Sequence, residues 1–109
     1  MAYTICSLDN APRVPFKFDG RILFSSGRYE LVHLTLQPGD GMEAHTQPMD
    51  VVFYVTEGTG TLAIGNPGSH QEMVEVGCDT AVHLKAGISR AWKNTGGQPL
   101  VILVNKLLP

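Results

Sequence analysis

Residues 38–60 read PGDGMEAHTQPMDVVFYVTEGTG, and this stretch decides the fold class. A Pro-Gly turn opens it, the β-branched and aromatic run Val51–Thr56 follows, and a Glu-Gly turn leads into the run Thr59–Gly65. Two such runs joined by a glycine turn predict a β-hairpin. The segment before the first run contains one histidine, His45, where a metal-binding hairpin would present several ligands. This single histidine raises the question of whether the chain holds a metal.

The rest of the chain repeats this pattern of short apolar runs separated by turn residues. Tyr29–Leu36 alternates strictly, with Val32 and Leu34 on one face and His33 on the other. Further strands are predicted over residues 15–18, 21–25, 70–77, 80–87, 89–97 and 99–107. About eight to ten strands at a spacing of about 8–12 residues predict an all-β sandwich or barrel.

Composition and charge narrow the class of protein. The chain has 109 residues, 43% hydrophobic and 17% charged, which is typical of a single globular domain. A net charge of −2 without a basic patch disfavours nucleic acid as a partner. The apolar runs are too short to span a membrane, and no signal-peptide pattern is present, so we expect a cytoplasmic protein. Cys6 and Cys78 are expected to be buried free thiols rather than a disulfide.

Two motifs in the chain resemble those of the cupin superfamily, in particular its small single-domain members with an RmlC-like barrel. The first cupin motif runs glycine, five residues, His-x-His, three or four residues, Glu, six residues, glycine, and Gly39, His45 and Gly58 keep this spacing. The second runs glycine, five residues, Pro-x-Gly, two residues, His, three residues, Asn, and Gly87 and Asn94 keep it. The resemblance implies a double-stranded β-helix (jelly-roll) barrel over residues 29–107, preceded by an N-terminal arm with strands over residues 1–28.

The chain departs from the family at the metal ligands. The positions of the two histidines, the glutamate and the third histidine are occupied by His45, Gln47, Val51 and Arg90. A glutamine carbonyl is a weak, neutral ligand, and valine has no ligand atom. A guanidinium about 4 Å from a divalent ion would repel it by about 8 kcal/mol at an effective dielectric constant near 20, and arginine does not lose its proton. We therefore favour no metal at these positions.

Strand alternation suggests instead a ligand pocket inside the barrel, with the predicted residues His45, Gln47, Arg90, Trp92, Phe53 and His33. An arginine fork, an imidazole, an amide and aromatic walls suit a small anion such as a carboxylate. The competing interpretation is that Arg90 pairs with Asp50 inside the barrel and that side chains fill the cavity. Whether the protein is an enzyme stays open.

Three alternatives to this interpretation use the same scaffold. A shifted site of His45, Gln47, His33 and His83 could bind zinc, iron, manganese or nickel, as in a metal-dependent oxygenase or isomerase. Alternatively, His33 and His83 are ordinary strand residues, and a barrel that has lost its site acts as a dimer module. Sugar epimerases of the family use a histidine base, an aspartate and a tyrosine acid, and His45, Asp50 and Tyr54 supply these types. Alternation is expected to turn Tyr54 away from the interior.

The resemblance also implies a homodimer. Leu100–Val104 is apolar on both faces, which indicates that this strand is covered both by its own barrel and by something else, such as a second subunit. The predicted contact segments are residues 99–109 and 11–18.

Overall fold

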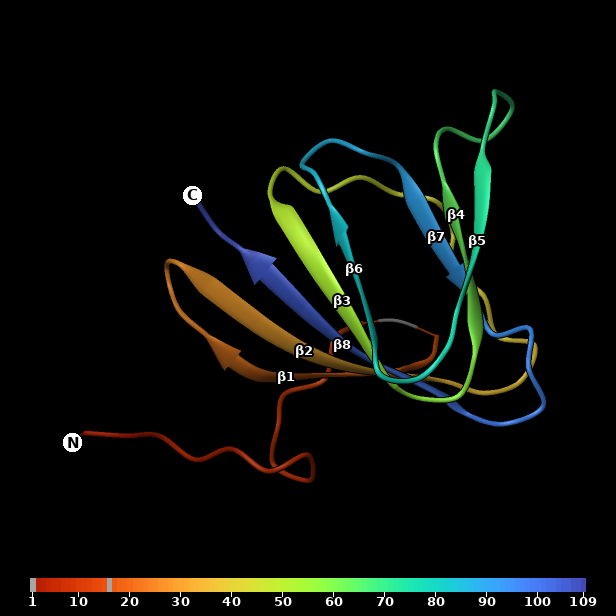
Figure 1. The fold of residues 1–109 in the computed structure, drawn as a ribbon. Coiled ribbons are helices and arrows are strands. Elements are labelled where there is room, and N and C mark those ends of the chain that lie inside the picture. Colours follow the sequence, from red (N-terminus) through yellow and green to blue (C-terminus); the bar gives the residue numbers. More distant parts are fainter. Residues whose placement is uncertain (1, 16) are drawn as a thin grey trace.

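The computed structural model describes residues 2–15 and 17–109, and these form eight β-strands (Figure 1). The strands are β1 (Asp19–Ser25), β2 (Tyr29–Leu36), β3 (Asp50–Glu57), β4 (Gly60–Ile64), β5 (Glu72–Val76), β6 (Thr80–Leu84), β7 (Arg90–Lys93) and β8 (Leu100–Leu107). The predicted all-β class is thereby confirmed. The hairpin predicted for Val51–Thr56 and Thr59–Gly65 is wrong, because β3 and β4 lie in different sheets: β3 pairs with β6 and β8, and β4 pairs with β5 and β7. The strand predicted over residues 15–18 is not found at Pro15, Lys17 or Phe18, and residue 16 lies outside the described residues.

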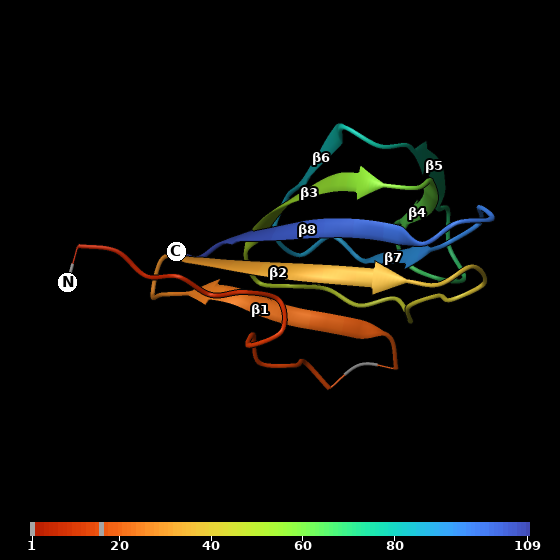
Figure 2. The ribbon, with the colours of Figure 1, turned by 90° about the horizontal axis from the view of Figure 1, so that it is seen from below.

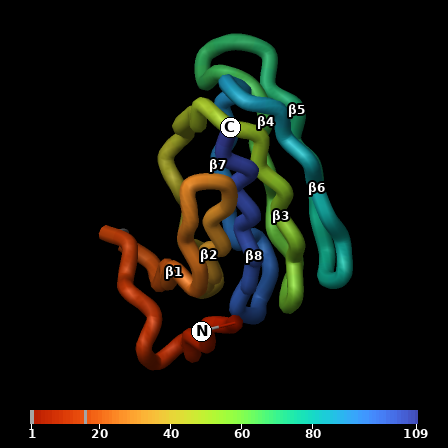
Figure 3. Tube along the Cα trace, turned by 90° about the vertical axis from the view of Figure 1, so that its left-hand side faces the viewer, coloured from red at the N-terminus to blue at the C-terminus, as the bar shows by residue number. Residues whose placement is uncertain are grey.

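The strands form two antiparallel sheets that face each other as a jelly-roll barrel. The larger sheet has the order β1-β2-β8-β3-β6, which Figure 3 shows from left to right, and the smaller sheet has the order β5-β4-β7. Strand β1 pairs with β2, so the N-terminal residues 1–28 contribute the edge strand of the larger sheet. Figure 2 shows β8 between β2 and β3, the most enclosed position in this sheet.

This central position explains much of the apolar character of β8. Its even-numbered residues point into the barrel, and Leu100 and Ile102 are fully buried. On the opposite face Val101 is only 8% exposed within this single chain, whereas Leu103 is half-buried. The outer face of β8 is therefore covered by the chain itself at one end and remains partly accessible farther along.

The core confirms the alternation predicted from the sequence. Val32, Leu34 and Leu36 of β2 are buried, whereas the residues between them are half-exposed. Strand β3 follows the same rule with Val51, Phe53 and Val55. Burying each large aliphatic or aromatic side chain contributes about 1.5–3 kcal/mol to folding. The inner faces of the two sheets thus supply both the stability of the barrel and the walls of its cavity.

The glycine positions of the motifs lie in turns that require an unusual backbone conformation. Gly58 joins β3 to β4 with φ of 79°, and a Cβ atom placed there would lie 2.4 Å from the carbonyl oxygen of Pro99. Asp79 stands at the first glycine position of the second motif and has φ of 59°. Aspartate tolerates this left-handed conformation better than most residues, and its carboxylate accepts a hydrogen bond of 3.0 Å from Tyr54. The spacing of the motif therefore reflects turn geometry rather than chemistry.

Cys6 and Cys78 are free thiols, as predicted, but both are exposed. The expectation that they are buried is wrong because Cys6 lies in the N-terminal segment and Cys78 in the turn between β5 and β6. Among the described residues there is no helix that is long and apolar enough to cross a membrane.

Candidate functional site

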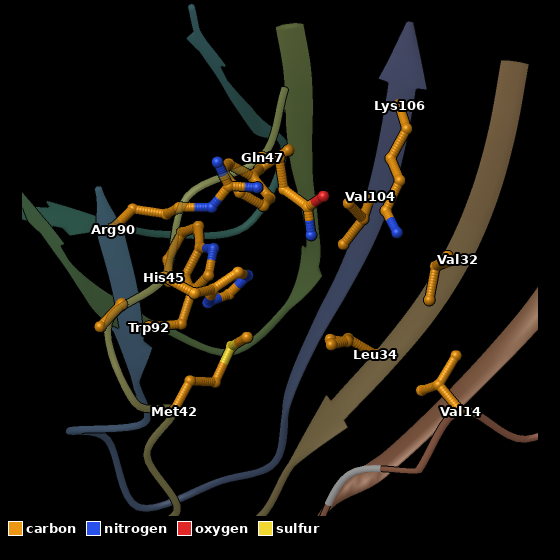
Figure 4. Close-up of a pocket in the computed structure, with 12 residues that line it drawn as sticks. Val14, Val32, Leu34, Met42, His45, Gln47, Arg90, Trp92, Val104 and Lys106 are labelled. Atoms are coloured by element: carbon orange, nitrogen blue, oxygen red, sulfur yellow. The ribbon is translucent and has the colours of Figure 1, made fainter. Parts of the chain in front are cut away.

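A pocket lies between the two sheets, and it is lined by β2, β3, β7, β8 and the segment that leads into β3 (Figure 4). Its walls are Val14, Val32, Leu34, Met42, His45, Gln47, Phe53, Arg90, Ala91, Trp92, Val104 and Lys106. The cavity measures about 60 Å³. Five of the six predicted pocket residues meet here.

The position of His45 follows from a short backbone pairing with β7. The amide of His45 donates to the carbonyl of Arg90 at 3.1 Å, and the amide of Arg90 donates to the carbonyl of His45 at 3.0 Å. The amide of Met42 likewise donates to the carbonyl of Trp92 at 2.9 Å. Residues that exchange two backbone hydrogen bonds point their side chains to the same face. The pairing therefore presents His45 and Arg90 to the pocket side by side.

Arg90 is a buried cation with few partners. The residue is 3% exposed, and its guanidinium carbon lies 5.7 Å from the centre of the Phe53 ring. One Nη1 contact to the carbonyl of Ile88 is long at 3.5 Å, and Nε has no hydrogen-bond partner. Among the described residues no carboxylate forms an ion pair with Arg90. Burial lowers the pKa of the Arg90 guanidinium, yet arginine remains charged at neutral pH.

Trp92 adds a second unused donor to the same wall. Its side chain is 2% exposed, and Nε1 has no hydrogen-bond partner within the part of the chain described here. The indole packs edge-on against Phe53, with ring centres 5.4 Å apart and planes at 85°. A buried N–H without an acceptor costs about 1–3 kcal/mol. The wall formed by Arg90 and Trp92 thus lacks an acceptor that a bound molecule would supply.

His45 and Gln47 face this wall with different hydrogen-bonding capacity. The Nδ1 atom of His45 lies 3.2 Å from the carbonyl oxygen of Glu43. Because a carbonyl only accepts, Nδ1 carries the hydrogen, and Nε2 of the neutral ring is left as an acceptor. The backbone carbonyl of Gln47 accepts from the amide of Gly87 at 2.8 Å. Figure 4 shows the Gln47 side-chain amide extending into the pocket, where it offers two donor hydrogens and an acceptor oxygen.

Asp50 does not pair with Arg90. Its carboxylate accepts from Nε2 of His83 at 2.9 Å and from the backbone amide of Ala86 at 3.0 Å. These two hydrogen bonds, with His83 contributing most, lower the pKa of Asp50. Asp50 therefore ties the start of β3 to the turn after β6. The interpretation in which an Arg90–Asp50 pair fills the barrel is wrong.

The other histidines lie outside the pocket. His33 lies between Val32 and Leu34 on β2, and since these two line the cavity, His33 points to the outer face of the sheet. The inclusion of His33 in the pocket is therefore wrong. His83 is exposed beside Asp50, as an ordinary strand residue, and His70 is exposed in the turn before β5. Tyr54 also points outward to Asp79, which confirms the expected orientation and leaves the epimerase arrangement unassembled.

The pocket residues do not fit the metal that many cupins bind. At the four ligand positions of the motif, Val51 offers no donor atom and Arg90 adds a buried positive charge. The shifted set of His45, Gln47, His33 and His83 is spread over the pocket, the outer face of β2 and the surface near Asp50. The described residues contain no group of three or more histidines, cysteines, aspartates or glutamates placed to hold an ion. What the pocket offers is a cation and hydrogen-bond donors.

The fold and the interior pocket define a small double-stranded β-helix barrel. Residues 32–105 match the family model of the cupin domain, so the chain belongs to the cupins. No curated protein matches the sequence significantly.

Solved structures of similar fold come from several microorganisms. A protein from Bacillus halodurans has 25% identity and a TM-score of 0.77, covering 83% of this chain and 70% of its own. An RmlC-like cupin from Methanocaldococcus jannaschii has 18% identity and a TM-score of 0.80, covering 99% and 93%. A predicted oxalate decarboxylase from Thermotoga maritima has 17% identity and a TM-score of 0.79, covering 97% and 100%.

Proposed function

We propose that this cupin binds a small carboxylate inside its barrel without using a metal. The observation that carries the proposal is Arg90, which is 3% exposed and has no ion-pair partner among the described residues. An uncompensated buried charge costs several kcal/mol, and a protein retains it at such a cost when a ligand supplies the opposite charge. A carboxylate accepts two parallel hydrogen bonds from a guanidinium, which is the strongest neutralisation available to arginine.

The surroundings of Arg90 favour an anion with an apolar body. The Nε1–H of Trp92 provides a further donor beside the guanidinium. The opposite wall consists of apolar side chains, among them Val32, Leu34 and Val104. Ligand sites typically combine such apolar walls with a few converging polar groups. The polar wall would orient the charged end of the ligand, and the apolar wall would enclose the remainder.

A second hollow leads from the surface to the pocket. It is lined by Pro15, Lys17, Phe18, Gly41, Met42, Glu43, Ala44, His45 and Gln47. Three of these residues also line the inner pocket, so the two spaces adjoin. The charges around this entrance are balanced, since Lys17 and Glu43 both line the hollow and Lys106 at the pocket rim is paired with Glu30 at 3.2 Å. The attraction for an anion therefore rests on Arg90 inside the pocket.

A thermal-shift titration tests the proposal. Acetate, propanoate and butanoate are titrated into the wild type, Arg90→Met and the control Arg28→Met, which removes the same charge from an exposed position. A carboxylate at a hundredfold its dissociation constant stabilises the binding-competent protein by about 2.7 kcal/mol. We expect this stabilisation in the wild type and in Arg28→Met, and its loss in Arg90→Met. An equal shift in Arg90→Met, or no shift with any carboxylate, would contradict the proposal.

Elemental analysis separates this function from the metal-dependent alternative. Protein produced in medium supplemented with zinc, iron, manganese and nickel is analysed after extensive dialysis. A metal-free protein that still binds carboxylates agrees with the proposal. Near-stoichiometric metal that is lost together with carboxylate binding would overturn it.

We also propose that the protein is a homodimer. Tyr3 and Ile5 in the extended N-terminal segment are 67% and 86% exposed, and Leu107 at the end of β8 is 45% exposed. Figure 1 shows that the N-terminal segment extends away from the barrel, where a second subunit could cover it. Sedimentation at micromolar concentration checks this proposal, and a clean monomer would exclude it.

A further inference from the structure

We propose that the anion is a short 2-hydroxy carboxylic acid, whose hydroxyl group is recognised by His45 and Gln47. This inference rests on the proposed function, because it takes the carboxylate of the ligand to be bound by Arg90 and Trp92. It names the chemical group beyond the carboxylate that the remaining polar atoms of the pocket require.

The inner pocket is small. Its cavity measures about 60 Å³, whereas the adjoining hollow measures about 440 Å³. An acid of two to four carbon atoms is the simplest ligand that reaches the polar side chains of the inner pocket without extending into the hollow.

The tautomer of His45 favours a hydrogen-bond donor on the ligand. Nδ1 is committed to the carbonyl of Glu43, so Nε2 of the neutral ring accepts. A simple carboxylate has no hydrogen to donate to this nitrogen. A hydroxyl group donates to Nε2 of His45 and at the same time accepts from the amide of Gln47, so it satisfies both side chains.

The backbone pairing brings the two binding side chains to one face of the pocket. His45 and Arg90 exchange two backbone hydrogen bonds, at 3.1 and 3.0 Å, so their side chains start about 5.5 Å apart on one face. A short ligand can therefore contact both side chains. We place its hydroxyl on the carbon next to the carboxylate, and the calorimetry below compares this position with the next carbon along.

The charge and hydrogen-bonding capacity of the pocket disfavour 2-amino and 2-oxo acids of equal size. A 2-amino acid of equal size places an ammonium group beside the Arg90 guanidinium, and the two positive charges repel each other. A 2-oxo acid offers only acceptors and cannot donate to His45. The apolar wall of Val32, Leu34 and Val104 can also cover a methyl group, so lactate should bind about fourfold more tightly than glycolate.

Isothermal titration calorimetry in the presence of a chelator tests the inference. The probes are both enantiomers of lactate, its positional isomer 3-hydroxypropanoate, propanoate, alanine and pyruvate. We expect one enantiomer of lactate to bind the wild type at least about fivefold more tightly than propanoate and 3-hydroxypropanoate, since one neutral hydrogen bond is worth about that factor. Alanine should not bind detectably.

Three variants identify the residues responsible. His45→Leu should bind lactate and propanoate equally, and His45→Phe, which keeps a flat ring without nitrogen, should do the same if the leucine variant folds poorly. Gln47→Leu should reduce the preference for lactate. Arg90→Met should remove the binding of every acid.

The outcomes distinguish the inference from the function on which it rests. Equal binding of lactate and propanoate by the wild type, or a preference for lactate that survives in both His45 variants, overturns the inference but leaves carboxylate binding in place. Failure of every acid to bind the wild type overturns both. Binding that requires His45 for lactate and Arg90 for all acids supports both.

Discussion

Arg90→Met is expected to stabilise the ligand-free protein. The arginine is 3% exposed, and its guanidinium has one long hydrogen bond of 3.5 Å and no carboxylate partner among the described residues. Methionine has a similar length and avoids the cost of keeping a cation out of water. Replacing buried charged groups by apolar ones of similar volume yields about 1–4 kcal/mol in other proteins. The lost contact with the Phe53 ring, at 5.7 Å, removes about 1–2 kcal/mol of this gain.

The net expectation is a gain of about 1 kcal/mol in the free energy of unfolding. For a domain of this length the gain corresponds to a rise in the melting temperature of about 4 °C. Urea unfolding of dialysed wild type and Arg90→Met, at equal protein concentration so that oligomerisation does not interfere, measures the difference. Arg28→Met is the control and should change stability by less than about 0.5 kcal/mol. A loss of more than about 1 kcal/mol in Arg90→Met would show that the arginine is structurally satisfied, and the reasoning that it awaits an anion would be refuted.

Three further predictions concern the turn, the surface pair and the pocket wall. Gly58→Ala should destabilise the fold by about 3 kcal/mol or more in urea unfolding, because its Cβ meets the Pro99 carbonyl at 2.4 Å and the backbone has φ of 79°. Gly27→Ala, with nothing within 4 Å, should have little effect, and equal losses would contradict the steric argument. Asp50→Asn should lower stability near pH 7. Since the folded-state pKa of Asp50 is lowered, its contribution is present above the unfolded value of 3.8 and disappears as the pH falls through the folded pKa, so the two unfolding curves should converge in acid. A stability difference between the wild type and Asp50→Asn that does not change with pH would show that the ionisation of Asp50 does not cause it. Trp92→Phe keeps an aromatic ring at this position but removes the Nε1 donor, and should weaken carboxylate binding about fivefold in calorimetry; unchanged affinity would show that the indole N–H does not contact the ligand.

Several features of this protein followed from the sequence alone. Alternation of apolar residues along Tyr29–Leu36 and Val51–Thr56 predicted the inward and outward faces, because side chains in a strand point to opposite faces in turn. The resemblance of the residues around Gly39, Gly58 and Asn94 to the cupin motifs implied the jelly roll. The argument against a metal at the motif positions needed only residue chemistry, because valine has no donor and arginine repels a cation. These inferences could be made from the sequence because they depend only on residue types and on neighbouring positions in the chain.

The tertiary structure decided which distant residues meet. The partner of Asp50 is His83, thirty-three positions away, and no local pattern distinguishes it from Arg90 as a candidate partner. The exposure of Cys78 depends on its place in a turn, and the isolation of the Arg90 and Trp92 nitrogens depends on every surrounding side chain.

The pairing of His45 with Arg90 shows most clearly which features the sequence determined and which the tertiary structure decided. The sequence predicted that both residues face the interior, since alternation and the motif depend on neighbouring positions. It did not predict that they exchange backbone hydrogen bonds, because this register forms only when the segment before β3 folds against β7 across the barrel. The sequence therefore indicated five of the six residues that it placed in the pocket, and His33 was the exception. The packing of the two sheets determined their spacing, the tautomer of His45 and the groups left for a ligand to satisfy.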